Sequence, residues 1–393
     1  MSSKKALAII YTFLPYVDTA GIVFAKRIQA EIQKDITVIS CKAYGGATLD
    51  HSLEQLAKPY LNKIIELDAK FTYRDWKFFE DFYNKALKAY EGEVESGVEY
   101  TELYSRSMSV ISHLVAYKIK QLNPSLKWIA EFSDPIIKDV TGDERQTIVP
   151  NEWLLSELNN IADIGLFRQY NNIFSLSEIL VYLYADEIKF TNPLQKQFML
   201  NYISEDILDF NFKPKFIYQV DQKSVIVPHP ILDEHFYSLG HSEIQTDPDK
   251  VNIAYFGNVN AKRSFNAFFE SWLVLPPHKR NTFRFYIFSN LKKETILNYI
   301  PEELRSYVIF GGNLNYLDFL SSLKDFDYLL TMDTEVQHIF GVNPFLPSKV
   351  ADYLGSTSKI IALVENGSPT SLILNERLLC FKYDLFNMSS LIA

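Results

Sequence analysis

The sequence predicts an α/β protein with two doubly wound domains, and three observations support this fold class. The chain of 393 residues is longer than one hydrophobic core usually supports. Short apolar runs rich in β-branched and aromatic residues recur at helix-length spacing, with helical periodicity between them. The series of runs then begins again after a polar stretch. Strands that are apolar on both faces and alternate with helices are typical of parallel sheets covered by helices.

The N-terminal half contains the first series of expected strands. They cover residues 6–13, 36–40, 102–107, 128–133, 187–192 and 224–230. Lys4 and Lys5 precede the first of them, but no small-residue cleavage site follows, so a β-strand is favoured over a signal peptide. The aromatic and basic segment 70–90 has helical periodicity, and it is either a packed helix or a helix that contacts a lipid surface.

A second series of expected strands follows residues 241–250, which are polar, include a proline and form the predicted linker. These strands cover residues 252–258, 283–290, 307–313, 328–333, 359–365 and 378–384. The two series predict an N-terminal domain over residues 1–240 and a C-terminal domain over residues 251–393, facing each other across a cleft.

Composition and charge exclude several classes of protein. A formal net charge of −9 argues against a protein that grips nucleic acid through a basic face. The two cysteines, Cys41 and Cys380, have neither metal-binding nor redox spacing, which indicates a reducing compartment without disulfides. No run approaches 18 apolar residues, so any membrane contact is expected to be peripheral.

The stretch "PFLPSKVADYLGS" (344–356) has the features of a helix start. Pro347 suits the first helical turn, Ser348 can help satisfy the free amides there, and Asp352 lies one turn beyond Ser348. Free amides at such a start can accept a phosphate. Two interpretations remain open at this point: an anion site, or a capped structural helix with Lys349 in solvent.

The stretch "YFGNVNAKRSF" (255–265) places a glycine turn beside two cations. Gly257 and Asn258 follow a strand, and Lys262 and Arg263 come near the start of the next helix. Arginine offers forked hydrogen bonds and lysine a point charge, so the pair can neutralise a diphosphate. The alternative is two ordinary surface charges.

A third stretch, "FGGNLNYLDFL" (310–320), also turns closely after a strand. Gly311 and Gly312 permit the turn and leave Asn313, Leu314 and Tyr316 to line a pocket.

Farther along, Asp325 and Asp327 form an "Asp-x-Asp" pattern. They lie where a helix ends and a strand begins, without other hard-cation ligands at suggestive spacing, so no metal site is predicted.

Taken together, "GNVNAKRS", "GGNLNYLDFL…FDYLL" and "LPSKVADYLGSTSKIIAL" resemble the donor-nucleotide half of a retaining glycosyltransferase of family 4, which has the GT-B architecture of two Rossmann-like domains. The resemblance covers residues 252–365 and extends more weakly through the N-terminal half. It implies a metal-independent hexosyltransferase that uses a nucleotide-sugar, most commonly a UDP-sugar, and no further cofactor. The acceptor-side domain would be residues 1–240.

The resemblance also implies roles for single residues. Lys262 and Arg263 would contact the diphosphate, Asn313 and Leu314 the nucleobase, and Asp352 the ribose hydroxyls. Gly21 would let the backbone approach the donor phosphate, unless it is a plain tight turn. The residues assigned to the donor are Gly21, Gly257, Asn258, Lys262, Arg263, Asn313, Leu314, Asn343, Ser348, Lys349 and Asp352.

One family feature is missing from this sequence. The family has two glutamates separated by seven residues, and counting back from Asp352 reaches Pro344 instead of an acid. Asn343, Glu335 or Asp333 are the residues of the preceding loop that can substitute for it.

The N-terminal half is expected to face the acceptor. Following the resemblance, the strand ends at "SRSMS" (105–109) and "FSDPI" (132–136) lie beside the reacting centre. Arg106 or Ser107 stands at the first position and Asp134 at the second, and Arg106 and Asp134 are the candidate catalytic residues. The alternative for Asp134 is a helix cap.

The resemblance implies transfer with retention to a glycan, lipid-linked or protein-linked acceptor during synthesis of bacterial cell-envelope polysaccharide. It implies a cytoplasmic protein, with any membrane contact at the inner face and no nucleic-acid partner. Two alternatives remain: a catalytically silent GT-B partner subunit, and a nucleotide-sugar epimerase, which would form product without an acceptor.

Overall fold

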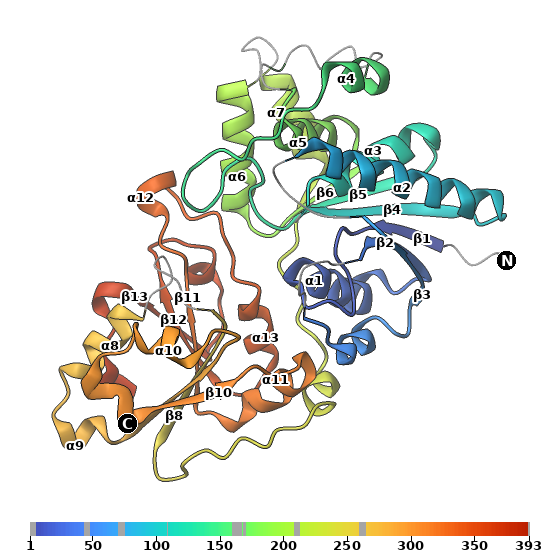
Figure 1. Ribbon diagram of the computed structural model, residues 1–393. Helices are drawn as coiled ribbons and strands as arrows, with labels where there is room; N and C mark the ends of the chain where they lie inside the picture. The colour runs from blue at the N-terminus through green and yellow to red at the C-terminus, as the bar shows by residue number, and fades with distance from the viewer. Residues whose placement is uncertain are drawn as a thin grey trace. The chain divides into compact units, whose positions relative to one another are not determined.

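The computed structural model describes residues 5–42, 48–69, 75–107, 109–158, 167, 170–207, 213–258 and 265–391. The chain divides into two compact units, Met1–Pro230 and Ile231–Ala393 (Figure 1). Within the described residues, no helix is long and apolar enough to cross a bilayer.

The N-terminal unit is built on a parallel sheet. In its described residues, seven strands lie in the order β3-β2-β1-β4-β5-β6-β7. Their bounds are β1 (Lys5–Ile9), β2 (Ile36–Cys41), β3 (Leu61–Leu67), β4 (Tyr100–Ser107), β5 (Lys127–Phe132), β6 (Glu187–Phe190) and β7 (Ser224–Ile226). The order reverses between β1 and β4, and ligands of such sheets bind outside the carboxyl ends of the strands near this point.

Strand β3 is the one strand of this sheet that the sequence did not predict. It lies at the edge, where β2 is its one strand partner within the described part of the chain, and none of its residues is fully buried. Its polar residues Asn62, Lys63 and Glu66 interrupt the apolar run. An edge strand needs no apolar residues on both faces, so the signal used for the other strands was absent.

Helices cover both faces of this sheet. They are α1 (Thr19–Arg27), α2 (Trp76–Glu95), α3 (Ile111–Leu122), α4 (Asn151–Leu158), α5 (Ile173–Tyr184), α6 (Pro193–Tyr202) and α7 (Lys213–Lys223). Figure 1 shows α2 and α3 on one face of the sheet and α1 on the other. Helix α2 buries Trp76, Phe79, Phe82 and Tyr90 in the core, so the aromatic segment is a packed helix.

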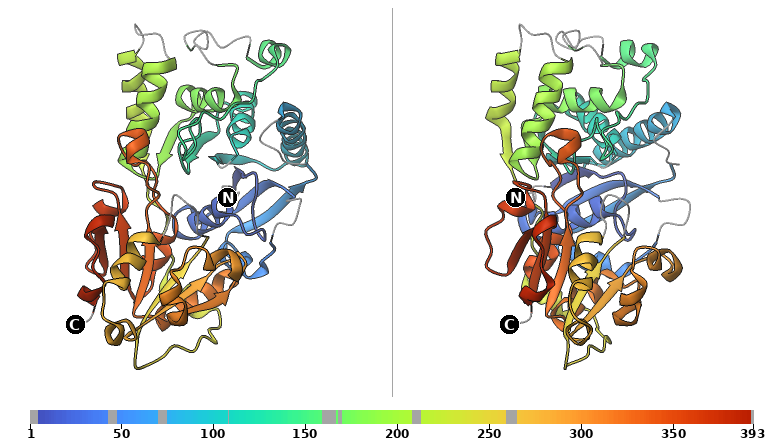
Figure 2. Two further views of the ribbon diagram at one scale, coloured as in Figure 1. Left: turned by 60° about the vertical axis from the view of Figure 1, so that its left-hand side comes forward. Right: turned by 90° about the vertical axis from the view of Figure 1, so that its left-hand side faces the viewer.

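The C-terminal unit repeats this plan. Six strands of its described residues lie in the order β10-β9-β8-β11-β12-β13, and every pair is parallel. Their bounds are β8 (Val251–Phe256), β9 (Phe283–Phe288), β10 (Val308–Gly312), β11 (Tyr328–Met332), β12 (Lys359–Val364) and β13 (Leu378–Lys382). All six were predicted. They can be followed from yellow for β8 to red for β13 in both views of Figure 2.

The helices of this unit are short. They are α8 (Asn266–Leu273), α9 (Pro277–Arg280), α10 (Lys293–Leu297), α11 (Tyr316–Ser322), α12 (Gln337–Phe340) and α13 (Lys349–Gly355). The polar stretch 241–250 lies in this unit, where the His241 amide donates to Asp318 Oδ1 at 2.8 Å. The strand order reverses between β8 and β11, so the ends of these two strands are the expected ligand position.

Candidate functional site

The turn after β8 brings together three residues assigned to the donor. Gly257 follows Phe256 with φ +143°, a conformation that favours glycine, and a Cβ there would overlap Nζ of Lys349. The Tyr255 hydroxyl donates to the carbonyl oxygen of Asn258 at 3.0 Å, and Lys349 Nζ lies 6.0 Å from the Tyr255 ring centroid. The ammonium of Lys349 therefore lies against a glycine turn at the strand end.

Helix α13 supplies the acid that the resemblance assigns to ribose. Asp352 is 6% exposed, and its Oδ1 accepts a hydrogen bond from the Tyr316 hydroxyl at 2.7 Å. The carbonyl oxygen of Asp352 accepts another from the Tyr237 hydroxyl at 2.9 Å. Burial and the Asp352 carboxylate raise the pKa of Tyr316, which keeps the phenol a donor. Ser348, just before the helix, makes no capping hydrogen bond with its side chain.

The loop after β10 carries the two residues assigned to the nucleobase. Gly312 has φ +72°, Asn313 is exposed and Leu314 is half-buried. The contact between Tyr316 and Asp352 brings the end of this loop next to α13. Lys262 and Arg263, the predicted diphosphate contacts, lie outside the described residues.

Asn343, a donor residue by sequence, is built into the loop between β11 and α13. It is 2% exposed, and its Nδ2 donates to the Thr334 carbonyl at 2.9 Å and to Glu365 Oε2 at 2.8 Å. Its Oδ1 accepts from the Phe345 amide at 3.0 Å. The side chain holds the loop in shape with all of its polar atoms.

The two acids that could replace the missing family glutamate differ in their surroundings. Asp333 is buried and accepts from the Glu365 amide at 3.1 Å and from Thr370 Oγ1 at 2.7 Å. Burial raises the pKa of Asp333 to about 6. Glu335 is exposed, and partial burial and repulsion from Glu365 raise its pKa. Of the three candidates, Glu335 is the one on the surface of the loop.

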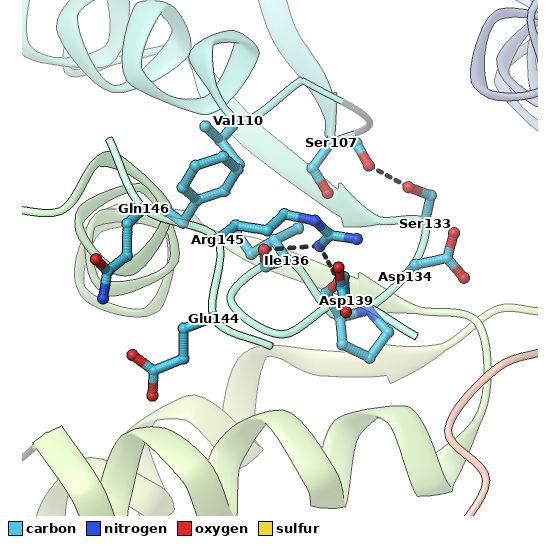
Figure 3. A pocket seen from close by; sticks show the side chains of 11 residues that line it. Ser107, Val110, Ser133, Asp134, Ile136, Asp139, Glu144, Arg145 and Gln146 are labelled. Atoms are coloured by element: carbon cyan, nitrogen blue, oxygen red, sulfur yellow. Dashed lines mark hydrogen bonds between the residues drawn. The ribbon is translucent and has the colours of Figure 1, made fainter. Parts of the chain in front are cut away.

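In the N-terminal unit, a cavity of about 670 Å³ opens at the carboxyl ends of β4 and β5 (Figure 3). Ser107 ends β4, whereas Ser133 and Asp134 directly follow β5. The cavity is lined by Ser107, Val110, Ser133, Asp134, Pro135, Ile136, Asp139, Glu144, Arg145, Gln146 and Phe174. Asp134, a candidate catalytic residue, is therefore part of its wall.

Arg145 organises the loop that forms most of this wall. Its Nη1 donates to the carbonyl oxygens of Pro135, Ile136 and Lys138 at 3.1, 2.9 and 3.3 Å. Its own carbonyl oxygen accepts from Asn172 Nδ2 at 3.0 Å, which ties the loop to the start of α5. Sequence reasoning missed this residue. The available signal was the long stretch without regular structure between β5 and α4, since long loops at strand ends are often functional.

Polar groups of two kinds face the cavity. Partial burial alone would raise the pKa of Asp139, but the hydrogen bonds from Thr141 together have the larger, opposite effect. The net pKa therefore lies below the ordinary value, and the Asp139 carboxylate stays ionised. The Ser133 hydroxyl donates to the carbonyl oxygen of Ser107. Ser107 is 1% exposed, and its hydroxyl has no hydrogen-bond partner among the described residues.

Arg106, the other candidate catalytic residue, does not line the cavity, which corrects the sequence-based placement. It is 2% exposed and bonds to Glu131, its register partner on β5. Arg27 of α1 also bonds Glu131, through Nε at 3.2 Å and Nη2 at 2.7 Å. Successive residues of a strand face opposite sides of the sheet, so Ser107 reaches the cavity and Arg106 does not.

Gly21 lies in the first turn of α1. Its amide donates to Oδ1 of Asp18, the helix cap, at 3.0 Å. A Cβ at this position would lie 2.7 Å from the carbonyl oxygen of Thr12. The glycine therefore lets the helix lie close to the backbone that follows β1.

Neither a protein-family model nor a curated protein matches this chain. Solved structures do match along almost its whole length. The lipopolysaccharide glycosyltransferase WaaG has a TM-score of 0.54 at 9% identity, covering 97% of this chain and 87% of WaaG. A UDP-forming α,α-trehalose-phosphate synthase from Burkholderia xenovorans has a TM-score of 0.54 at 8% identity, covering 96% and 89%.

The lipopolysaccharide outer core galactosyltransferase WaaB has a TM-score of 0.51 at 10% identity, covering 96% of this chain and 86% of WaaB. These structures are two-domain GT-B proteins, and the two parallel sheets described above match theirs. The predicted fold class is confirmed. At such identities the likeness establishes the fold, while the chemistry has to be argued from the residues of each unit.

Proposed function

We propose that this GT-B protein is a retaining glycosyltransferase that moves a sugar from a nucleotide-sugar to a hydroxyl group of a glycan, lipid-linked or protein-linked acceptor. One observation carries the proposal. Lys349 of α13 lies against Gly257 at the end of β8, next to the point where the strand order of the C-terminal sheet reverses, and Asp352 follows on the same helix. That is where a doubly wound sheet binds a nucleotide.

The chemistry of this cluster suits a nucleoside diphosphate. The Lys349 ammonium beside the glycine turn offers a positive charge to phosphate. Asp352 and Tyr316, already bonded to each other, can exchange hydrogen bonds with ribose hydroxyls, which both donate and accept. Lys262 and Arg263 would add charge from the segment between β8 and α8, and Asn313 and Leu314 would contact the nucleobase.

In the proposed reaction, an acceptor oxygen bonds to the anomeric carbon on the face from which the diphosphate leaves. The bond from that carbon to the diphosphate oxygen breaks, and the hydroxyl proton passes to the departing diphosphate. Lys349, Lys262 and Arg263 offset the growing negative charge, as a metal ion does in other transferases. Asp134 orients the acceptor. Such a route relies on positioning and needs no protein nucleophile.

The biological setting belongs to the same proposal. WaaG and WaaB act in lipopolysaccharide synthesis by their names. We place this protein in the synthesis of a bacterial surface polysaccharide, on the cytoplasmic side of the inner membrane. A UDP-hexose is the donor to test first.

A catalytically silent partner subunit is the second candidate, and one observation favours it. The family's first acid, separated from the second by seven residues, is replaced here by Pro344, and Asn343 and Asp333 are held in the framework of the loop. If Glu335 cannot take its place, the site would bind a nucleotide without transferring the sugar.

A thermal-shift and turnover screen with UDP-, GDP-, TDP- and CMP-sugars tests the proposal. We expect one donor to stabilise the protein and to be slowly hydrolysed. Lys349→Ala should weaken that donor's binding about tenfold or more, because a charge-assisted contact to phosphate is lost. Lys359→Ala is a matched control, since Lys359 lies 5.8 Å from the Tyr328 ring centroid at the opposite end of the sheet. Binding without hydrolysis or transfer would favour the silent subunit, and no donor binding would refute both.

A further inference from the structure

The cavity at the ends of β4 and β5 combines features that restrict what it can bind. Three carboxylates, those of Asp134, Asp139 and Glu144, line it. Arg145 is the one cation among its described lining residues, and Nη1 of that guanidinium is bonded to three carbonyl oxygens of the loop. The lining carries a formal charge of −2, and a phosphate or carboxylate group entering it would meet like charge.

Hydrogen-bonding groups of the wall match a ligand that both donates and accepts. The Ser107 hydroxyl is buried and has no partner among the described residues, although it faces the cavity (Figure 3). Buried hydroxyls are normally paired, so this one points to a ligand group. Gln146 offers an amide and Asp139 a carboxylate. Sugar hydroxyls can donate to carboxylates and accept from serine and amide groups.

One part of the wall is apolar. Its apolar lining consists of Val110, Pro135, Ile136 and Phe174. Small-molecule sites usually combine such a surface with a few placed polar groups, in volumes of roughly 300–1,000 Å³. The C–H face of a sugar ring fits against it.

We propose that this cavity is the acceptor subsite, and that it selects a neutral sugar ring and rejects phosphorylated or otherwise anionic sugars. The inference rests on the proposed glycosyltransferase function and specifies its acceptor class. The sugar lies against Phe174, with its hydroxyls bonded to Ser107, Gln146 and the carboxylates. Because the lining is net negative, the cavity does not suit a sugar phosphate.

Saturation-transfer NMR on the full chain tests the inference without requiring turnover. The probes are methyl glucoside, methyl galactoside, methyl mannoside and glucose 6-phosphate, at concentrations up to tens of millimolar and constant ionic strength. We expect saturation of at least one neutral glycoside and a signal from glucose 6-phosphate that is about tenfold weaker or absent, given the like charge in the cavity. Equal or stronger binding of glucose 6-phosphate, or no binding of any neutral glycoside, would overturn the inference.

Variants localise the binding to this cavity. Ser107→Ala should weaken the neutral glycoside about threefold to tenfold through the loss of one hydrogen bond. Ser125→Ala, at an exposed serine of the same unit, should not. The double substitution Asp139→Asn and Glu144→Gln should reduce the difference in affinity between the neutral glycoside and glucose 6-phosphate. Glu152→Gln on α4 should leave that difference unchanged. An unchanged difference in the double variant, or unchanged glycoside binding in Ser107→Ala, would also overturn the inference.

The donor screen keeps the two proposals apart. Nucleotide binding at Lys349 is measured separately, with nucleotide-sugars and by thermal shift. If the protein binds a donor but prefers glucose 6-phosphate, the proposed function stands and the inferred acceptor class is wrong. If the protein binds neutral glycosides but no donor, the proposed function is wrong, while the cavity would still be a site for a neutral sugar.

Discussion

Adjacent residues at the end of β4 have opposite environments. Ser107 lines the cavity, whereas Arg106 lies on the other face of the sheet in a buried cluster with Glu131 and Arg27. Burial would raise the pKa of Glu131, but the charges of Arg106 and Arg27 outweigh it and hold the pKa well below its ordinary value. Glu131 is therefore an ionised, structural residue that balances two guanidinium groups.

Glu131→Gln should destabilise the fold strongly. Removing the carboxylate leaves two buried guanidinium groups without their counter-charge, and breaking a buried ion pair in this way costs about 3–5 kcal/mol. Urea unfolding measures the change. Glu102→Gln is the control, because Glu102 pairs at 2.6 Å with Lys34, whose side chain is 42% exposed, and such pairs contribute at most about 1 kcal/mol. Similar losses in the two variants would contradict this account.

Glu178 is a second buried acid, with a different pH dependence. Burial raises its pKa to about 8, and the hydrogen bond from the Tyr182 hydroxyl at 2.8 Å opposes this only in part. The folded state therefore holds the proton over a range in which the unfolded carboxyl has lost it. The stability of the wild type should fall as pH rises from the ordinary value of 4.5 through about 8.

Glu178→Gln removes this titration. The variant should have a higher melting temperature than the wild type above about pH 8, and little or no advantage near pH 5, where the wild-type carboxyl is protonated. Melting curves across that range measure the difference. Glu152→Gln, at an exposed residue, should show no such pH-dependent difference in melting temperature from the wild type. A constant difference at all pH values would show that the carboxyl does not titrate with folding.

At the scale of elements, close packing determines where glycine is needed. In α1, a side chain at Gly21 would press on the carbonyl oxygen of Thr12, which belongs to the backbone and cannot turn aside. In α2, a side chain at Gly92 would meet nothing within 4 Å. The first glycine permits helix α1 to approach the turn after β1, and the second only adds flexibility to a helix.

The two glycines therefore predict opposite effects of alanine. Gly21→Ala should destabilise the protein by about 1–3 kcal/mol through overpacking. Gly92→Ala should stabilise it by about 0.5–1 kcal/mol, because alanine is the better helix former. Chemical unfolding of the two variants measures the sign of each change in the free energy of unfolding. A neutral Gly21→Ala would mean that α1 can shift away from the turn.

The elements were mostly predictable, and the exceptions have physical causes. All six strands of the C-terminal sheet carry apolar residues on both faces, so their sequences alone marked them. Edge strand β3 did not have this pattern. The loop wall of the cavity was missed because its shape depends on Arg145 reaching three carbonyl oxygens, and no periodicity marks such contacts.

At the scale of the whole molecule, each unit has a hydrophobic core of its own. Trp128 is fully buried in the N-terminal core and donates through Nε1 to Ser105 Oγ at 2.8 Å. Trp272 is fully buried in the C-terminal core and donates through Nε1 to the Arg280 carbonyl at 3.3 Å. Units with separate cores can in principle open separately.

A cavity in one core should weaken that unit first. Trp272→Ala is expected to remove about 3–5 kcal/mol, because a large side chain leaves a cavity behind. Hydrogen exchange followed by mass spectrometry should show faster exchange in peptides of residues 251–391 than in those of the N-terminal unit. Trp128→Ala should give the reverse. Uniform acceleration through the whole chain in either variant would mean that the units unfold together.

The sequence by itself determined the α/β class, the strands of both parallel sheets except one, and the segments that end at the two candidate sites. These follow from apolar runs, helical periodicity and glycine turns, which are local properties of the chain. The tertiary structure decided which side chains meet. In the folded protein, Tyr316 is hydrogen-bonded to Asp352, and Arg106 points away from the cavity toward Glu131. Asn343 is hydrogen-bonded to Glu365. These contacts depend on residues far apart in the chain, and only the folded sheets and loops bring them within hydrogen-bond distance.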